Sequence, residues 1–172
     1  QIRNSELALR ALLTTAERGQ ILAIPTGTED LAARYTLSDA DKSLIRQRRG
    51  EANRLGFTVQ LALLRYPGIA LAEDTEVPPE LVSWLASRIA VSSEWGEYGT
   101  REETRQEHGR EIRAYLGMSA FGIAEFRELV EHVGGVAAQT DKGLLLVESA
   151  RDFLRARKVA LPGISVLERA CA

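Results

Sequence analysis

The feature that most constrains this chain is a stretch from Leu55 to Leu64 that contains no charged side chain. Its apolar residues point in nearly every direction around a helical wheel: Leu55, Phe57, Val59, Leu61, Ala62, Leu63 and Leu64. A helix that is apolar almost all round belongs in the core of a protein. The stretch therefore predicts a central buried helix, which ends at Tyr66 because Pro67 disfavours helix at the residue before it.

One strip of this helix remains polar or small. It consists of Arg54, Thr58, Ala62 and Arg65, at spacings of four, four and three that place them on one face. We therefore expect a single exposed stripe along an otherwise buried helix, with an arginine at each end.

A cluster of arginines precedes the apolar stretch. Arg46, Arg48, Arg49 and Arg54 fall within nine positions that contain one acidic residue, Glu51. A helix, a tight turn at Gly50 and the central helix would together resemble a helix-turn-helix unit. On DNA, such arginines neutralise phosphates or read guanine, and Asn53 could read adenine. The alternatives are a solvated basic face, arginines paired with Asp39, Asp41 and Glu51, and an Asn53 amide that ties backbone together.

The overall charge hides a strong segregation along the chain. The formal net charge is −2, which gives no global basic signature. Residues 42–65, however, carry six bases and one acid, whereas residues 66–100 carry one base and six acids. Residues 151–158 carry four bases and one acid. A nucleic-acid binder is expected to show a local basic patch, so the total charge does not exclude one.

Signals for helix starts recur along the chain, whereas strand signals are few. Thr14 with Glu17 and Ser38 with Asp41 have the spacing of capping boxes, and Thr28 is expected to cap a helix over 29–35. Further helices are expected after Pro79, over 100–116, over 121–133 and over 144–158, with a last one begun at 164 and truncated. The fold class is therefore all-α. We expect two helical subdomains, 1–70 and 78–172, joined by an acidic linker at 71–77.

Six segments, in this order, resemble the N-terminal region of transposases of the Tn-three family, the replicative bacterial transposons. They are LLTTAERGQILAIP (12–25), YTLSDADKSLIRQRR (35–49), QRRGEANRLGFTVQLALLRYPG (47–68), EWGEYGTREETRQEHGREIRAYLG (94–117), QTDKG (139–143) and LPGISVLERACA (161–172). The resemblance implies sequence-specific binding of double-stranded DNA at the transposon's terminal inverted repeats. It also implies that the catalytic carboxylates, and any divalent metal, belong to a C-terminal part that is absent here, so this fragment is not itself expected to be an enzyme.

Two further segments are candidates for contacting DNA. Arg101, Arg105 and His108 have helical spacings of four and three, and Arg113 could extend that face. The resemblance to the family makes this charged helix a candidate for facing a DNA groove. Its four bases and four acids are also typical of an ordinary solvated helix with internal ion pairs. Lys142, within QTDKG, could hold a phosphate, or its loop could be purely structural. With the arginine stripe, the predicted nucleic-acid-binding set is Arg46, Arg48, Arg49, Asn53, Arg54, Arg65, Arg101, Arg105, His108, Arg113 and Lys142.

The composition argues against other classes of function. Cys171 is the only cysteine and there are two histidines, so we expect neither disulfides nor a cysteine-rich zinc site, and no cofactor in this fragment. The uncharged run 55–64 is half of what a membrane span needs, and no signal peptide is visible. The expected partners are transposon-end DNA and the rest of a transposase chain, in a bacterial cytoplasm, with no membrane or small-molecule substrate. The alternative function is a helical protein-interaction domain for transposase assembly or target choice.

Overall fold

The computed structural model describes residues 11–172, and in this range the protein is all-α, as predicted. Two isolated bridges, Ile69 with Leu161 and Ser119 with Val159, are the β-pairing among these residues. The helices are Thr15–Ile21 (α1), Thr28–Tyr35 (α2), Asp39–Arg46 (α3), Glu51–Arg65 (α4), Pro79–Ile89 (α5), Glu102–Leu116 (α6), Ile123–Ala137 (α7), Gly143–Ala156 (α8) and Ile164–Cys171 (α9), with a 3-10 turn over Gly96–Thr100 (η1). No helix of the described range is long and apolar enough to cross a membrane.

Helix α4 is the centre of the larger group of helices. It ends at Arg65, and every residue from Leu55 to Leu64 is buried, which confirms the central helix. The predicted exposed stripe is wrong, however, because Thr58 and Ala62 are as buried as their apolar neighbours. The Thr58 hydroxyl donates to the Arg54 carbonyl, so its burial leaves no hydroxyl unpaired. Helix α4 is therefore enclosed on all sides, with α2, α3, α5, α6 and η1 packed around it.

The helix starts follow the capping signals at α1, α3 and α5 but differ at α2 and at α6, which begins at Glu102 without a side-chain cap instead of at Thr100. Thr14 and Ser38 both form complete capping boxes, and Pro79 occupies the first turn of α5. At α2, in contrast, Gly27 is the capping residue and Thr28 already lies within the helix. A glycine is an accepted N-cap because it adopts the extended backbone without a side-chain penalty.

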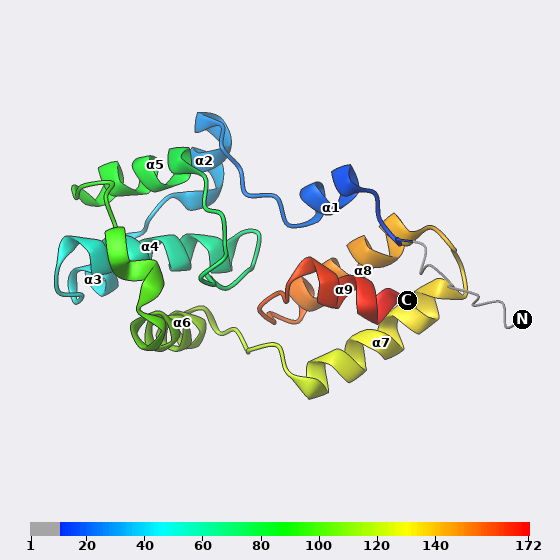
Figure 1. Ribbon diagram of the computed structural model, residues 1–172. Coiled ribbons are helices and arrows are strands. Elements are labelled where there is room, and N and C mark those ends of the chain that lie inside the picture. Colours follow the sequence, from blue (N-terminus) through cyan, green and yellow to red (C-terminus); the bar gives the residue numbers. More distant parts are fainter. Residues whose placement is uncertain (1–10) are drawn as a thin grey trace, which may run out of the picture.

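The packing divides the helices into two lobes that lie side by side (Figure 1). The central lobe consists of α2 to α6, whose buried residues form two adjoining clusters on either side of α4. The terminal lobe consists of α1, α7, α8 and α9 and has a separate apolar cluster. The sequence predicted a boundary at 71–77, but α5 and α6, which follow that linker, pack on α4, whereas α1 packs on α8. The grouping thus follows the apolar faces and not the order of the chain.

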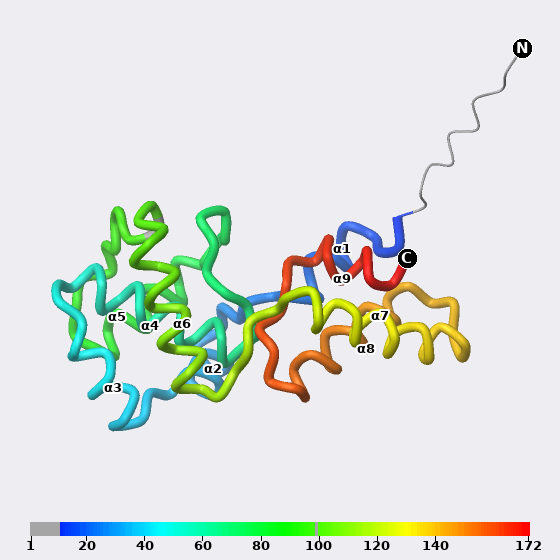
Figure 2. Tube along the Cα trace, turned by 90° about the horizontal axis from the view of Figure 1, so that it is seen from below, coloured from blue at the N-terminus to red at the C-terminus, as the bar shows by residue number. Residues whose placement is uncertain are grey.

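Backbone hydrogen bonds join the lobes where the chain passes between them, and Figure 2 shows these connecting segments from below. Leu161 N–H donates to the Gly68 carbonyl at 2.8 Å, and Ala160 N–H donates to the Ser119 carbonyl at 2.9 Å. The Arg155 guanidinium adds a bond to the Pro67 carbonyl at 2.9 Å. The end of the central helix is therefore tied directly to the segment between α8 and α9.

Candidate nucleic-acid interface

The turn between α3 and α4 separates the clustered arginines by direction. Gly50 has φ of 82°, a left-handed conformation that favours glycine, and this sharp turn starts α4 at the next residue. Arg48 is half-buried and turned into the protein, whereas Arg49 is exposed. The Asn53 amide donates to the Arg49 carbonyl at 2.9 Å and so fixes the turn. The interpretation of Asn53 as a backbone tie is confirmed.

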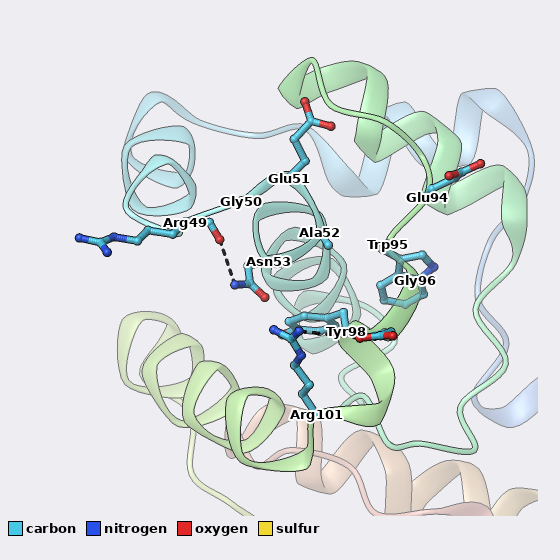
Figure 3. A pocket seen from close by; sticks show the side chains of 11 residues that line it. Arg49, Gly50, Glu51, Ala52, Asn53, Glu94, Trp95, Gly96, Tyr98 and Arg101 are labelled. Carbon is cyan, nitrogen blue, oxygen red and sulfur yellow. Dashed lines mark hydrogen bonds and ion pairs between the residues drawn. The ribbon is translucent and has the colours of Figure 1, made fainter.

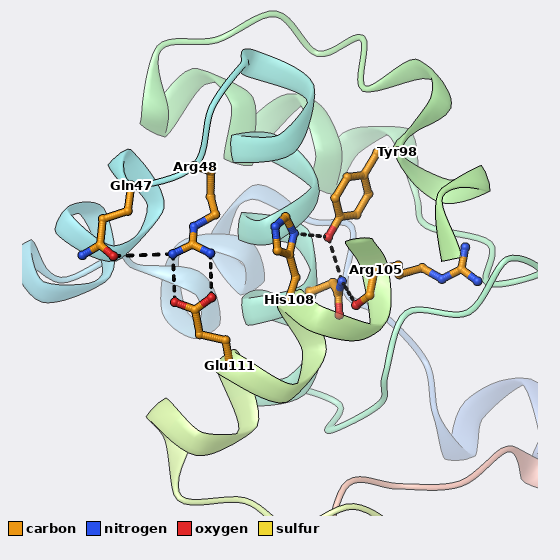
Figure 4. Close-up of polar contacts among 7 residues, drawn as sticks. Gln47, Arg48, Tyr98, Arg105, His108 and Glu111 are labelled. Carbon is orange, nitrogen blue, oxygen red and sulfur yellow. Dashed lines mark hydrogen bonds and ion pairs between the residues drawn. The ribbon is translucent and has the colours of Figure 1, made fainter. Parts of the chain in front are cut away.

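Arg48 is engaged inside the protein. Its guanidinium makes two parallel hydrogen bonds to the Glu111 carboxylate, at 2.6 and 2.8 Å (Figure 4). It also lies 4.8 Å from the centre of the Phe57 ring. Because the side chain is 16% exposed and its charge is already paired, Arg48 connects the α3–α4 turn to α6. The Arg48 side chain therefore lies inside the protein and not on the predicted DNA-facing surface.

His108 also points inward, so the predicted exposed face of Arg101, Arg105 and His108 is wrong for this member. His108 lies 2.8 Å from the Tyr98 hydroxyl through Nδ1, stacks against the Tyr98 ring and meets the edge of Phe57. The Gln60 amide donates both to the Tyr98 hydroxyl, at 2.7 Å, and to the Arg105 carbonyl, at 2.9 Å. Figure 4 shows this network between α4, η1 and α6. The interpretation of α6 as a charged helix missed that His108 and Gly109 join Ile112 on its buried face.

The Tyr98 ring can enter this network because α4 carries a glycine beneath it. A Cβ atom at Gly56 would lie 2.3 Å from the ring. The hydroxyl accepts from Gln60, and its own hydrogen is available to donate to Nδ1 of a neutral His108. Burial lowers the pKa of His108, and the nearby Arg48 charge lowers it further. Both effects favour the neutral form of the imidazole.

A neutral buried histidine makes the stability of the central lobe depend on pH. Its folded pKa lies below the ordinary value of about 6.5, so the unfolded state binds the proton more readily. We expect the free energy of unfolding to decrease as the pH falls from about 6.5 towards the folded pKa. The measurement is urea unfolding at several pH values, followed by the fluorescence of Trp84 and Trp95, which both lie in the central lobe.

The control for this dependence is the second histidine. His132→Gln changes a side chain of the terminal lobe, bonded to Ser149, and should leave the fluorescence-detected dependence intact. His108→Gln should flatten it. An unchanged pH profile in His108→Gln would contradict a buried neutral imidazole.

Arg65, expected at the end of the exposed stripe, is bound to a buried carboxylate. Its guanidinium makes two hydrogen bonds to Asp41, at 2.6 and 2.7 Å, and the Tyr115 hydroxyl donates to the same carboxylate at 2.7 Å. The alternative that some arginines pair with Asp41 is thus confirmed for Arg65. This ion pair holds α3 against the end of α4.

Three of the predicted residues do share one hollow. Arg49, Asn53 and Arg101 line a cavity of about 520 Å³ between the start of α4 and the segment that enters α6. Figure 3 shows the Arg101 guanidinium beside Tyr98 and below Asn53, the Arg49 side chain extending away from these residues, and the carboxylates of Glu51 and Glu94 above them. The contact of Arg101 with Glu97 is long, at 3.8 Å, and both side chains are exposed. Arg49 and Arg101 therefore meet at one hollow, which the carboxylates of Glu51, Glu94 and Glu97 line as well.

Arg46 and Arg54 lie at a second hollow, of about 280 Å³, together with two cations that the sequence reading did not select. These are Lys42, one turn before Arg46 on α3, and Arg88 on α5. The i,i+4 spacing of Lys42 and Arg46 was a visible signal. The approach of Arg88 could not be inferred, because it depends on how α5 packs.

The remaining predicted residues are dispersed. Arg105 is half-buried on α6, where its carbonyl accepts from Gln60, and Arg113 is half-buried towards the end of that helix. Lys142 is exposed directly before α8 in the terminal lobe. Whether any residue of the predicted set touches DNA stays a prediction. No group of three or more potential metal ligands occurs among residues 11–172.

Comparison with known proteins gives one family and several relatives. A family model described as a domain of unknown function, DUF4158, matches residues 12–172. The chain is 49% identical over 164 residues to the transposase for transposon Tn501 of Pseudomonas aeruginosa, and 44% and 41% identical to the transposases for transposons Tn21 and Tn3926 of Escherichia coli. Each match covers 95% of this chain and 17% of the relative. The resemblance to transposases of the Tn-three family is thereby confirmed.

Proposed function

The chain belongs to the DUF4158 family, and from that premise we propose that it is a DNA-binding segment of a transposase, which recognises the terminal inverted repeats of its transposon. The chain spans about one sixth of the length of the curated relatives it matches, 17% of each. The strand cutting and joining of such a transposase, with any divalent metal, would then belong to the rest of that protein. This segment binds and positions, and it acts where bacterial DNA lies, in the cytoplasm.

The observation that carries this proposal is the shared cavity of Arg49, Asn53 and Arg101. Arg49 and Arg101, from distant parts of the sequence, are exposed at one surface. Neither forms a close ion pair among the described residues. Exposed guanidinium groups bind phosphate oxygens and supply most of the affinity of a protein for duplex DNA. Between them, the turn of Gly50 exposes the first residues of α4, as the turn of a helix-turn-helix unit would.

The alternative of a protein-interaction domain lacks a corresponding surface. Such a domain would present a contiguous apolar patch. Among residues 11–172, the exposed large apolar side chains are Tyr115, Ile123, Val130 and Leu145, spread over three helices. Scattered residues of this kind are ordinary on a protein surface. The charge arrangement therefore favours DNA over a protein partner for the central lobe.

Neutralising either arginine of the cavity should weaken DNA binding in a salt-dependent way. For Arg49→Gln and Arg101→Gln, we expect lower affinity for both the inverted repeat and random duplex DNA. The slope of log K against log salt should become shallower by about 0.9 for each lost phosphate contact. The measurement is a titration of each variant against both duplexes at two salt concentrations.

Arg110→Gln is the matched control, because Arg110 is exposed on α6 outside the cavity. It removes the same charge and should leave the slope unchanged. If all three variants reduce binding equally, net charge and not this surface governs the affinity. If Arg49→Gln and Arg101→Gln bind like the unaltered chain, the cavity is not the interface.

A further inference from the structure

The hollow formed by α3, α4 and α5 is surrounded by positive charge. Lys42, Arg46, Arg54 and Arg88 line its sides, and the apolar residues Ile45 and Ile89 with Ala90 complete it. No carboxylate among residues 11–172 lines it. Another hollow, of about 260 Å³, lies next to it, and Lys42 and Arg88 line both. The four cations come from three helices, so the cluster is a product of the fold.

Two of the carboxylates near these cations in the sequence are engaged elsewhere. Asp41, next to Lys42, is buried and bound to Arg65 and Tyr115. Glu51, three positions before Arg54, accepts a hydrogen bond from the Ser92 N–H at 3.3 Å. The mutual repulsion of the four cations is therefore not relieved by an acid at the hollow, and an anion placed there would relieve it.

The helix dipoles explain the positions of only two of the four cations. Arg46 and Arg88 lie in the last turns of α3 and α5, where the helix dipole favours a cation. Lys42 and Arg54 are each the fourth residue of their helices, close to the positive end of the dipole. A cation gains nothing from its own helix at that position. The dipoles of their own helices therefore do not account for their place at the hollow.

Arg54 is oriented for such a partner. Its Nε donates to the Arg48 carbonyl at 3.0 Å, which fixes the guanidinium beside the α3–α4 turn. Its two terminal nitrogens have no hydrogen-bond partner within the described part of the chain. Arg49, at the neighbouring 520 Å³ cavity, belongs to the same turn, so the two hollows border one short segment, residues 46–54.

We propose that this hollow binds a phosphate group of the DNA backbone, with Lys42 and Arg88 as phosphate-binding residues beside Arg46 and Arg54. The inference rests on the proposed function and deepens it, because it adds a second phosphate contact next to the Arg49–Arg101 cavity. Arginine supplies planar pairs of donors for phosphate oxygens, and lysine supplies a point charge. The contact positions the duplex against the α3–α4 turn without reading its sequence.

The test is the Lys42→Gln variant of the chain, compared with Lys42→Arg, which keeps the charge. The Lys42 side chain makes no hydrogen bond or ion pair among the described residues, so we expect both variants to keep the unaltered melting temperature. For Lys42→Gln, affinity for inverted-repeat and random duplexes should fall about five- to tenfold near 0.1 M salt, and the salt slope should become shallower by about 0.9. Lys42→Arg should stay within about twofold of the unaltered chain. Arg46→Gln, at an exposed position, repeats the measurement should Lys42→Gln fail to fold.

A second arm separates backbone phosphate from free phosphate. Inorganic pyrophosphate is titrated directly against the unaltered chain and Lys42→Gln at constant ionic strength. A loss of duplex binding in Lys42→Gln with the expected change of slope supports the proposal. A loss of pyrophosphate binding alone overturns it, because the hollow would then serve a free anion. If the unaltered chain binds duplex DNA, and both Lys42→Gln and Arg46→Gln keep the salt slope of that chain, the phosphate contact at this hollow is wrong while the proposed function stands. If the unaltered chain binds no duplex, the proposed function fails and this inference falls with it.

Discussion

Replacing Phe57 by alanine is expected to lower the free energy of unfolding of the central lobe by about 3–5 kcal/mol, the usual effect of removing a large aromatic from a packed core. The Phe57 ring is fully buried in the middle of α4. It meets the His108 ring edge-on, with centroids 5.2 Å apart, and lies under the Arg48 guanidinium. Its loss would leave a cavity beneath two polar groups that depend on it for their position.

The measurement is urea unfolding followed by tryptophan fluorescence, because Trp84 and Trp95, the two tryptophans of the chain, both lie in the central lobe. Ile123→Ala is the control, since that side chain is 75% exposed at the start of α7. It should change the midpoint little. An unchanged midpoint for Phe57→Ala would show that α4 is not the packed centre of this lobe.

Replacing Asp41 by alanine should lower the free energy of unfolding by about 3 kcal/mol, near the lower end of the range for breaking a buried ion pair. Asp41 is 1% exposed and accepts hydrogen bonds from Arg65, Tyr115 and the Ser38 N–H. Arg65 keeps some contact with water, at 29% exposure, so its unpaired charge is less costly than a fully buried one. The substitution also removes half of the capping box of α3.

The Asp41 carboxylate also determines how the free energy of unfolding changes as the pH falls. Burial alone raises the pKa of Asp41, but the hydrogen bonds from Arg65, Ser38 and Tyr115 outweigh burial and hold the pKa well below its ordinary value. Its contribution to stability is complete above the unfolded pKa, about 3.9, and is lost as the pH falls below that value. Asp41→Ala should therefore lose less stability than the unaltered chain between about pH 4 and pH 2.

Asp39→Ala is the matched control, because Asp39 is an exposed carboxylate two residues earlier in the first turn of α3. It removes the same charge from the same helix end. If it destabilises the protein as much as Asp41→Ala, the effect comes from the helix dipole and not from the ion pair with Arg65.

The sequence contained enough to predict the elements of the fold. The run from Leu55 to Leu64 determines a buried helix because no face of it can be left in water, and Ser38 with Asp41 determines a helix start because both partners are local. Such signals depend on neighbours three or four residues away. These local signals hold in any tertiary arrangement, so the helices can be predicted from them before that arrangement is known.

The pairing of charges could not be predicted in the same way. Arg48 and Glu111 are separated by 63 positions, and several other acids had equal claim to that arginine. His108 occupied a helix with charges on most faces, and only the contact with α4 decides that it is buried. The exposure of a predicted residue was therefore inferred correctly where the turn itself sets it, as at Arg49, and incorrectly where a distant partner buries the side chain, as at Arg48.

The terminal lobe is discontinuous in the chain, and this has a consequence for how the protein is made. α1 emerges from the ribosome before any of the central lobe, yet the apolar partners of Leu13 and Ile21 lie on helices that begin only at Ile123. During synthesis α1 must wait, uncovered, while the complete central lobe folds behind it. Domains fold as units during translation, and exposed apolar segments of incomplete ones invite misassembly. The sequence of α1 suits this delay, because it is short and carries a charged or polar residue at most positions, Glu17, Arg18 and Gln20 among them.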